Sequence, residues 1–265
     1  MKITVCELPD GRDEFSSAWI RLAESVHGEA SELILLPDMP FASWFASSRQ
    51  FDVAVWNAAV RAHDEWEHRL TELGATYVLS SRPIDFGNER WDEGYVWDAE
   101  HGVRSVHAKS QFRSEKGAWE TEWYRTSFPE FVPLDLEGNL VVGFLMGAEL
   151  SAAEEARRYG EEHVDVIAVP RGANVMPFER WRDRARELAQ LASAHVIAST
   201  RAGTFGGQAC IIAPDGEVLG TTSATQPILT LDIQLPNRAV CHVPLKPDDL
   251  AGLVDPLDTG VPPYS

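Results

Sequence analysis

The chain has 265 residues, 44% of them hydrophobic, and carries 41 acidic against 23 basic side chains for a net charge of −18. This length and composition can bury one full core, so we expect one large domain rather than two. The acidic surplus repels phosphate groups, which argues against a nucleic-acid partner and against an anionic membrane surface. Three widely spaced cysteines form no Cys-x-x-Cys pair, which favours a reducing cytoplasm over a disulfide framework or a zinc site.

Strand and helix patterns alternate from the start of the chain. Residues 2–8 form a β-rich run, and residues 32–38 form a continuous apolar run typical of a central strand covered on both faces. Apolar residues at helical spacing predict helices over 13–26 and 52–74, the second closed by Gly74. The first residues soon turn polar and no apolar run is long enough to cross a bilayer, so we expect no signal peptide and a cytoplasmic location.

The rest of the chain continues the alternation without an internal repeat or a low-complexity linker. This pattern favours one α/β domain with a mixed sheet. The tail after Pro236 is rich in Pro and Asp and has no periodicity. The further predicted elements are strands over 76–81, 93–98, 103–109, 165–171 and 195–201, helices over 151–160 and 178–194, a hairpin over 208–223, and a strand that runs into a tight turn over 142–150.

Polar residues follow five of the apolar runs at their carboxyl ends. In α/β sheets, ligands bind in the crevice outside these ends, so several such residues together predict a site. The residues are Asp38, Lys109, Gly147 with Glu149, Arg171 and Arg201.

Neither a metal site nor a nucleotide loop is indicated. The eight histidines are scattered and include no His-x-His or His-Glu-x-x-His spacing, so we expect no metal. The glycine-rich run RAGTFGGQ lacks the strand and helix that flank a dinucleotide-binding loop. We therefore expect no cofactor.

The succession LILLPDM, VHAKSQF, VGFLMGAELSAAEEARRYG and VDVIAVPRG resembles the nitrilase, or carbon–nitrogen hydrolase, superfamily from Ile3 through the strand LTLDI. The resemblance implies a four-layer αββα sandwich over residues 1–235 that pairs through helices into a homodimer, with the tail 236–265 at the interface. Members of this superfamily hydrolyse nitriles, amides or carbamoyl groups, or transfer acyl groups, with a Glu–Lys–Cys triad and no metal or organic cofactor. A small-molecule substrate is therefore the implied ligand.

The catalytic positions carry over incompletely. Asp38 stands where the family has a glutamate, so the carboxylate is one methylene shorter. Lys109 in HAKSQF matches the lysine motif, and Glu120 matches a second glutamate, with Glu122 as a weaker candidate. The turn Gly147-Ala148-Glu149 and the following Glu-Glu-Ala-Arg hold the spacing of the nucleophile motif, which places Gly147 where the family has its cysteine.

No other residue is expected to replace the missing thiol. Met146 has a thioether that cannot form a thiolate, and Ser151 lies beyond the turn on the helix. Cys210 lies in a strand, where small buried cysteines are packing residues, and Cys241 lies in the tail.

Aromatic and polar residues near these motifs are candidates for substrate binding. The tryptophans after Asp38 and around Glu120 either pack in the core or wall a small-molecule pocket. Glu149 either binds substrate or forms a structural pair with Arg157 beneath the turn. The expected substrate-binding residues are Gly147, Ala148, Glu149, Trp44, Trp119, Trp123 and Arg171.

Three hypotheses follow from this pattern. The protein is an enzyme that has left covalent catalysis and uses Asp38, Lys109 and Glu120 for acid–base chemistry; or a non-catalytic homologue that binds a small amide, a carboxylate or a protein; or an altered hydrolase whose Gly147 was a cysteine. We favour the first, because an idle site should lose its lysine and its acidic residue as readily as its cysteine.

Overall fold

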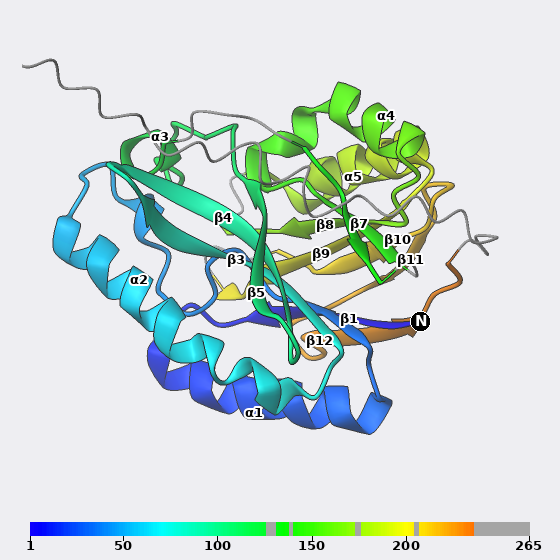
Figure 1. The fold of residues 1–265 in the computed structure, drawn as a ribbon, viewed down its shortest axis with the longest axis horizontal. Helices are drawn as coiled ribbons and strands as arrows, with labels where there is room; N and C mark the ends of the chain where they lie inside the picture. The colour runs from blue at the N-terminus through cyan, green and yellow to red at the C-terminus, as the bar shows by residue number, and fades with distance from the viewer. Residues whose placement is uncertain (126–130, 138–139, 173–175, 204–206, 236–265) are drawn as a thin grey trace, which may run out of the picture.

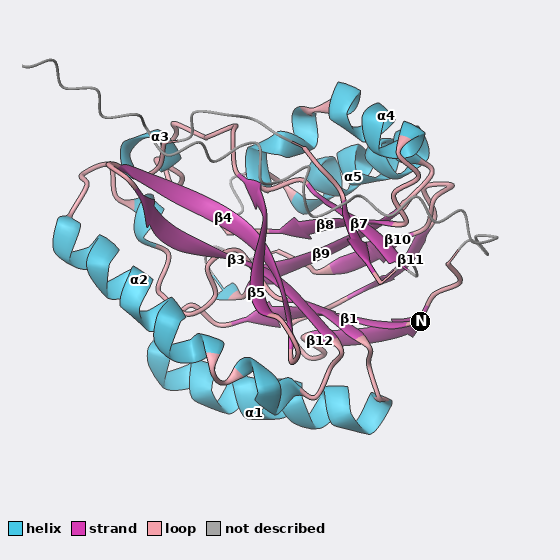
Figure 2. Ribbon diagram, in the orientation of Figure 1, coloured by secondary structure: helices cyan, strands magenta, loops and turns pink. Residues whose placement is uncertain are grey.

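The computed structural model describes residues 1–125, 131–137, 140–172, 176–203 and 207–235. Two layers of strands face each other and helices cover their outer surfaces (Figure 1, Figure 2). The described strands are β1 (Lys2–Leu8), β2 (Leu33–Leu35), β3 (Tyr77–Phe86), β4 (Glu89–Asp98), β5 (Gly102–Ala108), β6 (Leu134–Leu136), β7 (Leu140–Phe144), β8 (Val166–Pro170), β9 (His195–Arg201), β10 (Cys210–Ile212), β11 (Val218–Thr221) and β12 (Ile228–Asp232). The α-helices are α1 (Arg12–Glu29), α2 (Val53–Glu67), α3 (Glu120–Trp123), α4 (Ala153–Glu161) and α5 (Phe178–Ala192), and the 3₁₀ turns are η1 (Phe45–Ser47), η2 (Leu70–Leu73) and η3 (Gly147–Ser151).

The two layers have matching topologies. One runs in the order β12-β1-β2-β3-β4-β5 and the other in the order β11-β10-β9-β8-β7-β6. A short parallel pairing of Glu7 and Leu8 in β1 with Thr200 and Arg201 in β9 joins them at one end. α1 and α2 lie on the outside of the first layer, and α4 and α5 on the outside of the second (Figure 1). This arrangement is the predicted αββα sandwich.

The space between the two layers is filled by apolar side chains from both. β2 and β8 are buried along their whole length, as their continuous apolar runs predict for central parallel strands. Burial of this apolar surface is the main favourable contribution to folding. The central core includes Val5, Leu35, Leu79 and Val96 from the first layer and Val142, Phe144, Val166, Ile197 and Ile211 from the second.

The outer helices are held by apolar stripes at helical spacing. α1 buries Phe15, Trp19 and Leu22, which pack on the outer face of the first layer. α5 buries Trp181 and Leu188 against the second layer in the same way. These stripes hold the helices over the outer face of each layer, so this face is covered by helices.

The predicted helix over 52–74 is correct only in its first part. Asp52 caps α2 by accepting hydrogen bonds from the backbone N–H groups of Ala54 and Val55. The helix ends at Glu67. Two residues later, the N–H of Arg69 bonds three residues back, to the Trp66 carbonyl oxygen, and the chain continues as η2. Gly74 closes that turn in the left-handed conformation, with φ of 68°.

The hairpin of β3 and β4 is longer than predicted. The strands expected over 76–81 and 93–98 extend to Phe86 and back to Glu89, and only Gly87 and Asn88 connect them. The outer part of the hairpin is mostly polar and contains Pro83, which hides its strand character, and its Gly-Asn turn is the available signal. The extension brings Asp92 into β4 beside the end of β5.

The remaining differences are local. α3 and β6 are not among the predicted elements, and the helix expected at 151–160 starts at Ala153, after the turn η3. In the part of the chain that the structure describes, no helix is both long and apolar enough to span a membrane. The tail 236–265, with Cys241, lies outside the described residues.

Candidate active site

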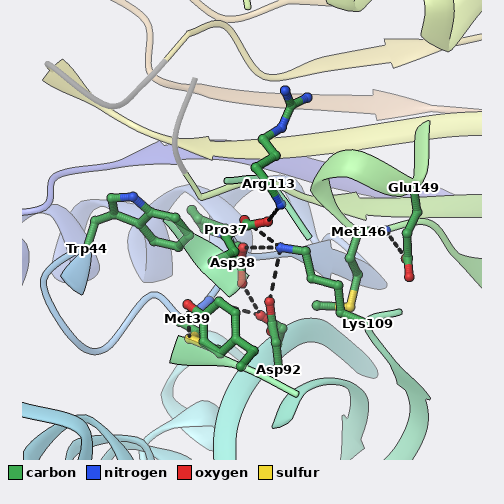
Figure 3. Close-up of polar contacts among 12 residues, drawn as sticks. Pro37, Asp38, Met39, Trp44, Asp92, Lys109, Arg113, Met146 and Glu149 are labelled. Carbon is green, nitrogen blue, oxygen red and sulfur yellow. Dashed lines mark hydrogen bonds and ion pairs between the residues drawn. The ribbon is translucent and has the colours of Figure 1, made fainter. Parts of the chain in front are cut away.

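A buried lysine surrounded by three carboxylates is the centre of the site. Lys109 directly follows β5, and its side chain has no exposed surface. Its Nζ lies 2.8 Å from Glu120 Oε1, 3.2 Å from Asp92 Oδ2 and 3.6 Å from Asp38 Oδ2 (Figure 3). The structure therefore brings the three residues predicted for catalysis together and adds a fourth, Asp92.

Asp38 is held in place at the end of the run that begins with β2. Its Oδ1 accepts a hydrogen bond of 2.6 Å from the Ser81 hydroxyl, and its N–H donates to the Arg171 carbonyl oxygen at 3.2 Å. The guanidinium of Arg201 donates to the carbonyl oxygens of Asp38 and Met39. Arg201 therefore supports the loop that carries Asp38 rather than the carboxylate itself.

Glu120 approaches Lys109 from α3, a single helical turn. One carboxylate oxygen accepts from Lys109, and the other accepts from the backbone N–H of Arg113 at 2.8 Å. Both oxygens are thus satisfied, and the side chain is almost fully buried. Glu122, the weaker candidate, offers its backbone carbonyl to Arg90 instead.

Asp92 is not among the predicted site residues, although the hairpin register could have identified it. Glu93 pairs with Ala108 in the β4–β5 hairpin, so the preceding Asp92 lies beside Lys109. The Lys109 N–H also donates to the Asp92 carbonyl oxygen at 2.9 Å. A strand assignment that began one residue earlier would have placed this carboxylate at the site.

Burial and mutual charge shift the proton affinities within this group. Burial lowers the pKa of Lys109, but the charges of Glu120, Asp38 and Asp92 outweigh it and hold that pKa well above its ordinary value. Burial, followed by the negative charge of Asp38, raises the pKa of Asp92 well above its ordinary value. Lys109 is therefore a permanent cation at this site.

Gly147 begins the turn η3 from the opposite layer and faces the same lysine. It has a φ of 55°, in the left-handed region that favours glycine. A Cβ atom at this position would lie 3.1 Å from Lys109 Nζ and 3.9 Å from Glu120 Oε1. Any side chain at Gly147 would thus stand directly against the charged group.

Glu149 connects the turn to the lysine-bearing strand. Its Oε2 accepts from the N–H of Met146 (Figure 3) and from Nε2 of His107. Its Oε1 accepts from the N–H and hydroxyl of Ser110. Burial raises the pKa of Glu149, but the interaction with His107 and these hydrogen bonds outweigh it and lower that pKa overall. The carboxylate is fully buried and its four contacts are with protein groups, but Arg157, the partner expected from the sequence, is exposed and is not among them.

Of the aromatic and arginine side chains predicted to bind substrate, that of Trp44 lies close to Asp38, and the others make contacts elsewhere. The Trp44 ring lies against Gly172, where a Cβ atom would be 2.4 Å from the ring and 2.9 Å from Asp38 Oδ2. Trp123 packs among the core aromatics, and Trp119 lies half-buried under the guanidinium of Arg49. The guanidinium of Arg171 donates to the carbonyl oxygen of Gln208 and lies over the Trp181 ring.

No described cysteine is suited to replace a nucleophile. Cys6 and Cys210 are buried, and burial raises the pKa of each thiol to about 12. Among the described residues, no group of three His, Cys, Asp or Glu side chains could hold a metal ion. Proton transfer and charge stabilisation are what the described side chains of this site can provide.

Comparison with known proteins identifies the family. The family model for carbon–nitrogen hydrolases matches residues 11–241. The chain belongs to the carbon–nitrogen hydrolase family. No curated protein matches it.

Among solved structures, this carbon–nitrogen hydrolase family member is similar in fold to an amidase from Nesterenkonia sp. AN1 and to a carbon–nitrogen hydrolase from Helicobacter pylori G27. The amidase superposes with a TM-score of 0.72 at 16% identity and covers 88% of this chain and 93% of its own. The Helicobacter protein gives a TM-score of 0.74 at 15% identity, with 87% and 88% covered.

Replacing Glu149 should destabilise the protein by about 3 kcal/mol at neutral pH, since Gln cannot accept all four hydrogen bonds in a buried site. Because the folded-state pKa of Glu149 is lowered, its contribution is present above the ordinary glutamate pKa of about 4.3 and is lost as the pH falls through the folded value. Urea unfolding of Glu149→Gln across this range measures both effects. Glu155→Gln, which removes an exposed pair with Arg158, is the control and should cost less than about 1 kcal/mol.

Proposed function

We propose that this protein acts on a small carbon–nitrogen compound, an amide, nitrile or carboxylate-like molecule, by acid–base chemistry without a covalent thioester. The convergence of Asp38, Glu120 and Gly147 on the ammonium of Lys109 carries this proposal. A carboxylate base and a fixed cation are the groups that hydrolysis of an amide by water requires.

In the proposed reaction, Asp38 accepts a proton from water as the water oxygen attacks the carbonyl carbon of the substrate. The ammonium of Lys109 stabilises the negative charge that develops on the carbonyl oxygen. The C–N bond then breaks and the leaving nitrogen takes the proton back from Asp38, so the acid–base groups return to their starting state. Glu120, through its contact with Lys109, fixes the direction of the ammonium.

Gly147 is proposed to occupy the position of the family nucleophile. A glutamate-to-glutamine variant of the amidase from Nesterenkonia sp. AN1 forms an adduct with acrylamide at its active-site cysteine, and a cysteine-to-alanine variant binds butyramide. Small amides are accordingly the first compounds to test with this chain. A Cβ atom at Gly147 would lie 3.1 Å from Lys109 Nζ, so the absence of a side chain lets the turn approach the ammonium closely.

Two alternatives use the same residues differently. In a non-catalytic homologue, the Lys109 cluster would bind a small amide or carboxylate without turning it over. In an altered hydrolase, Gly147 would stand where the natural protein has cysteine, and the remaining groups would be an intact machinery without its nucleophile. Measured turnover distinguishes our proposal from the non-catalytic homologue. The reactivity of a cysteine introduced at Gly147 distinguishes it from the altered hydrolase.

Loss of turnover on removal of the base or the cation tests the acid–base mechanism. Ammonia release from small amides and nitriles should fall at least about 100-fold in kcat/KM in Asp38→Asn and in Lys109→Ala. Asp64→Asn, an exposed position on α2, is the control and should be unaffected. Circular dichroism confirms that each variant is folded. Ligand binding that is unchanged in both active-site variants, without turnover in the wild type, would instead indicate a non-catalytic homologue.

Introducing a thiol tests the proposed role of Gly147. In Gly147→Cys, we expect the native activity to be blocked and no acyl adduct to appear by mass spectrometry with activated esters. Gly147→Ala imposes the same left-handed backbone, a cost of about 1–2 kcal/mol, without the thiol, and so separates crowding from chemistry. A stable acyl adduct on the cysteine variant would contradict remodelled chemistry and identify a disabled hydrolase.

We further propose a homodimer in which α4 and α5 lie near the interface and the chain after residue 235 crosses to the partner. This follows the pairing that the family resemblance implies. Light scattering at micromolar concentration should give about twice the mass of one chain. A monomer under these conditions would rule out this arrangement.

A further inference from the structure

The Lys109 cluster carries more negative than positive charge. Three carboxylates, those of Asp38, Asp92 and Glu120, surround one ammonium, and none of the four side chains is more than 5% exposed. If all were ionised, two negative charges would remain uncompensated in an environment that solvates charge poorly. Proteins avoid such states by pairing the charge or by binding a proton.

Neighbouring groups of the described chain do not supply the missing positive charge. Arg201 donates to Asp10 and to backbone carbonyl oxygens, among them that of Asp38, rather than to a carboxylate of the cluster. Arg113 gives Glu120 only its backbone N–H, while its guanidinium pairs with Glu115. The remaining titratable neighbour, Tyr124 at the end of α3, is neutral, because burial followed by the charges of the cluster raises its pKa well above the ordinary value.

The hydrogen bonds indicate which carboxyl group is least supported as an anion. Both oxygens of Glu120 accept hydrogen bonds, and Asp38 Oδ1 accepts from the Ser81 hydroxyl. Asp38 Oδ2 and Asp92 Oδ1 are buried without a hydrogen-bond partner among the described residues. Asp92 receives only the Lys109 ammonium, on its other oxygen. It is therefore the carboxylate with the weakest stabilisation.

We propose that Asp92 holds a proton at neutral pH and forms, with Asp38, an unequal acid–base pair around Lys109. A neutral Asp92 removes one of the charges that repel the Asp38 carboxylate, so it is a positioning residue that acts through Asp38 and Lys109. The effect of burial and of Asp38 on the pKa of Asp92 agrees with this assignment. The role of Asp92 in catalysis rests on the proposed function, whereas the presence of its proton does not.

Unfolding as a function of pH tests the assignment without a substrate. A folded-state pKa above the ordinary aspartate value of about 3.9 means that stability is highest below that value and is lost as the pH rises through the folded value. Asp92→Asn imitates the neutral form at every pH. Its melting temperature should match that of the wild type below about pH 4 and exceed it by a margin that widens as the pH rises toward the folded value.

Asp98→Asn, on the same strand, is the matched control of opposite sign. Although burial raises the pKa of Asp98, hydrogen bonds from His101 and Glu100 outweigh it and lower that pKa. This variant should therefore be less stable than the wild type at neutral pH, with a difference that shrinks as the pH falls. The same behaviour in Asp92→Asn would show that Asp92 is ionised and would overturn the proposal.

Infrared spectroscopy of the wild type provides a second measurement if Asp92→Asn does not fold. A carboxylic-acid C=O band that persists at about pH 7.5 and shifts in D₂O is expected. Burial also raises the pKa of Glu7, so Glu7→Gln removes the other described carboxyl group with a raised pKa and should leave the band in place. Absence of the band overturns the proton assignment but not the proposed function. If the band is present but the protein shows no turnover, the proton assignment stands and the proposed function is overturned.

Discussion

Burial of the Lys109 ammonium is the constraint on which the site depends. An ammonium that leaves water must find anionic partners, and its partners here come from the chain after β2, from β4 and from α3. These segments are adjacent only because β2, β3, β4 and β5 are neighbours in one layer. The charged group is therefore a product of strand order as much as of residue type.

The opposite layer contributes the backbone of the turn rather than a charge to this group. Gly147 reaches Lys109 from the end of β7, and Glu149 bonds both to Met146 beside it and to Ser110 beside Lys109. Close packing of the layers supports this bridge, since a Cβ atom at Gly94 would lie 2.9 Å from the Phe144 ring. A small shift between the layers would separate the turn from the lysine, which makes the central core part of the functional geometry.

The chemistry available at the site follows from what is ionised there. The two described cysteines are buried, and burial raises the pKa of each thiol, so neither of them is suited to act as a nucleophile. In the proposed function, the ammonium of Lys109 lies among carboxyl groups that serve as acid and base.

Local pattern and motif spacing in the sequence determined much of this protein. Apolar runs and helical stripes were sufficient for one α/β domain with a mixed sheet, and the family resemblance implied the αββα sandwich. The motifs that carry this resemblance named Asp38, Lys109, Glu120 and Gly147, which the structure brings to one place. Only the tertiary structure decided that Asp92 belongs to the site, because this depends on the register of a hairpin whose outer half is mostly polar and contains Pro83. It also decided that Glu149 serves as a bridge and that the guanidinium of Arg171 turns away, because the partners of a long polar side chain come from distant segments that local pattern does not specify.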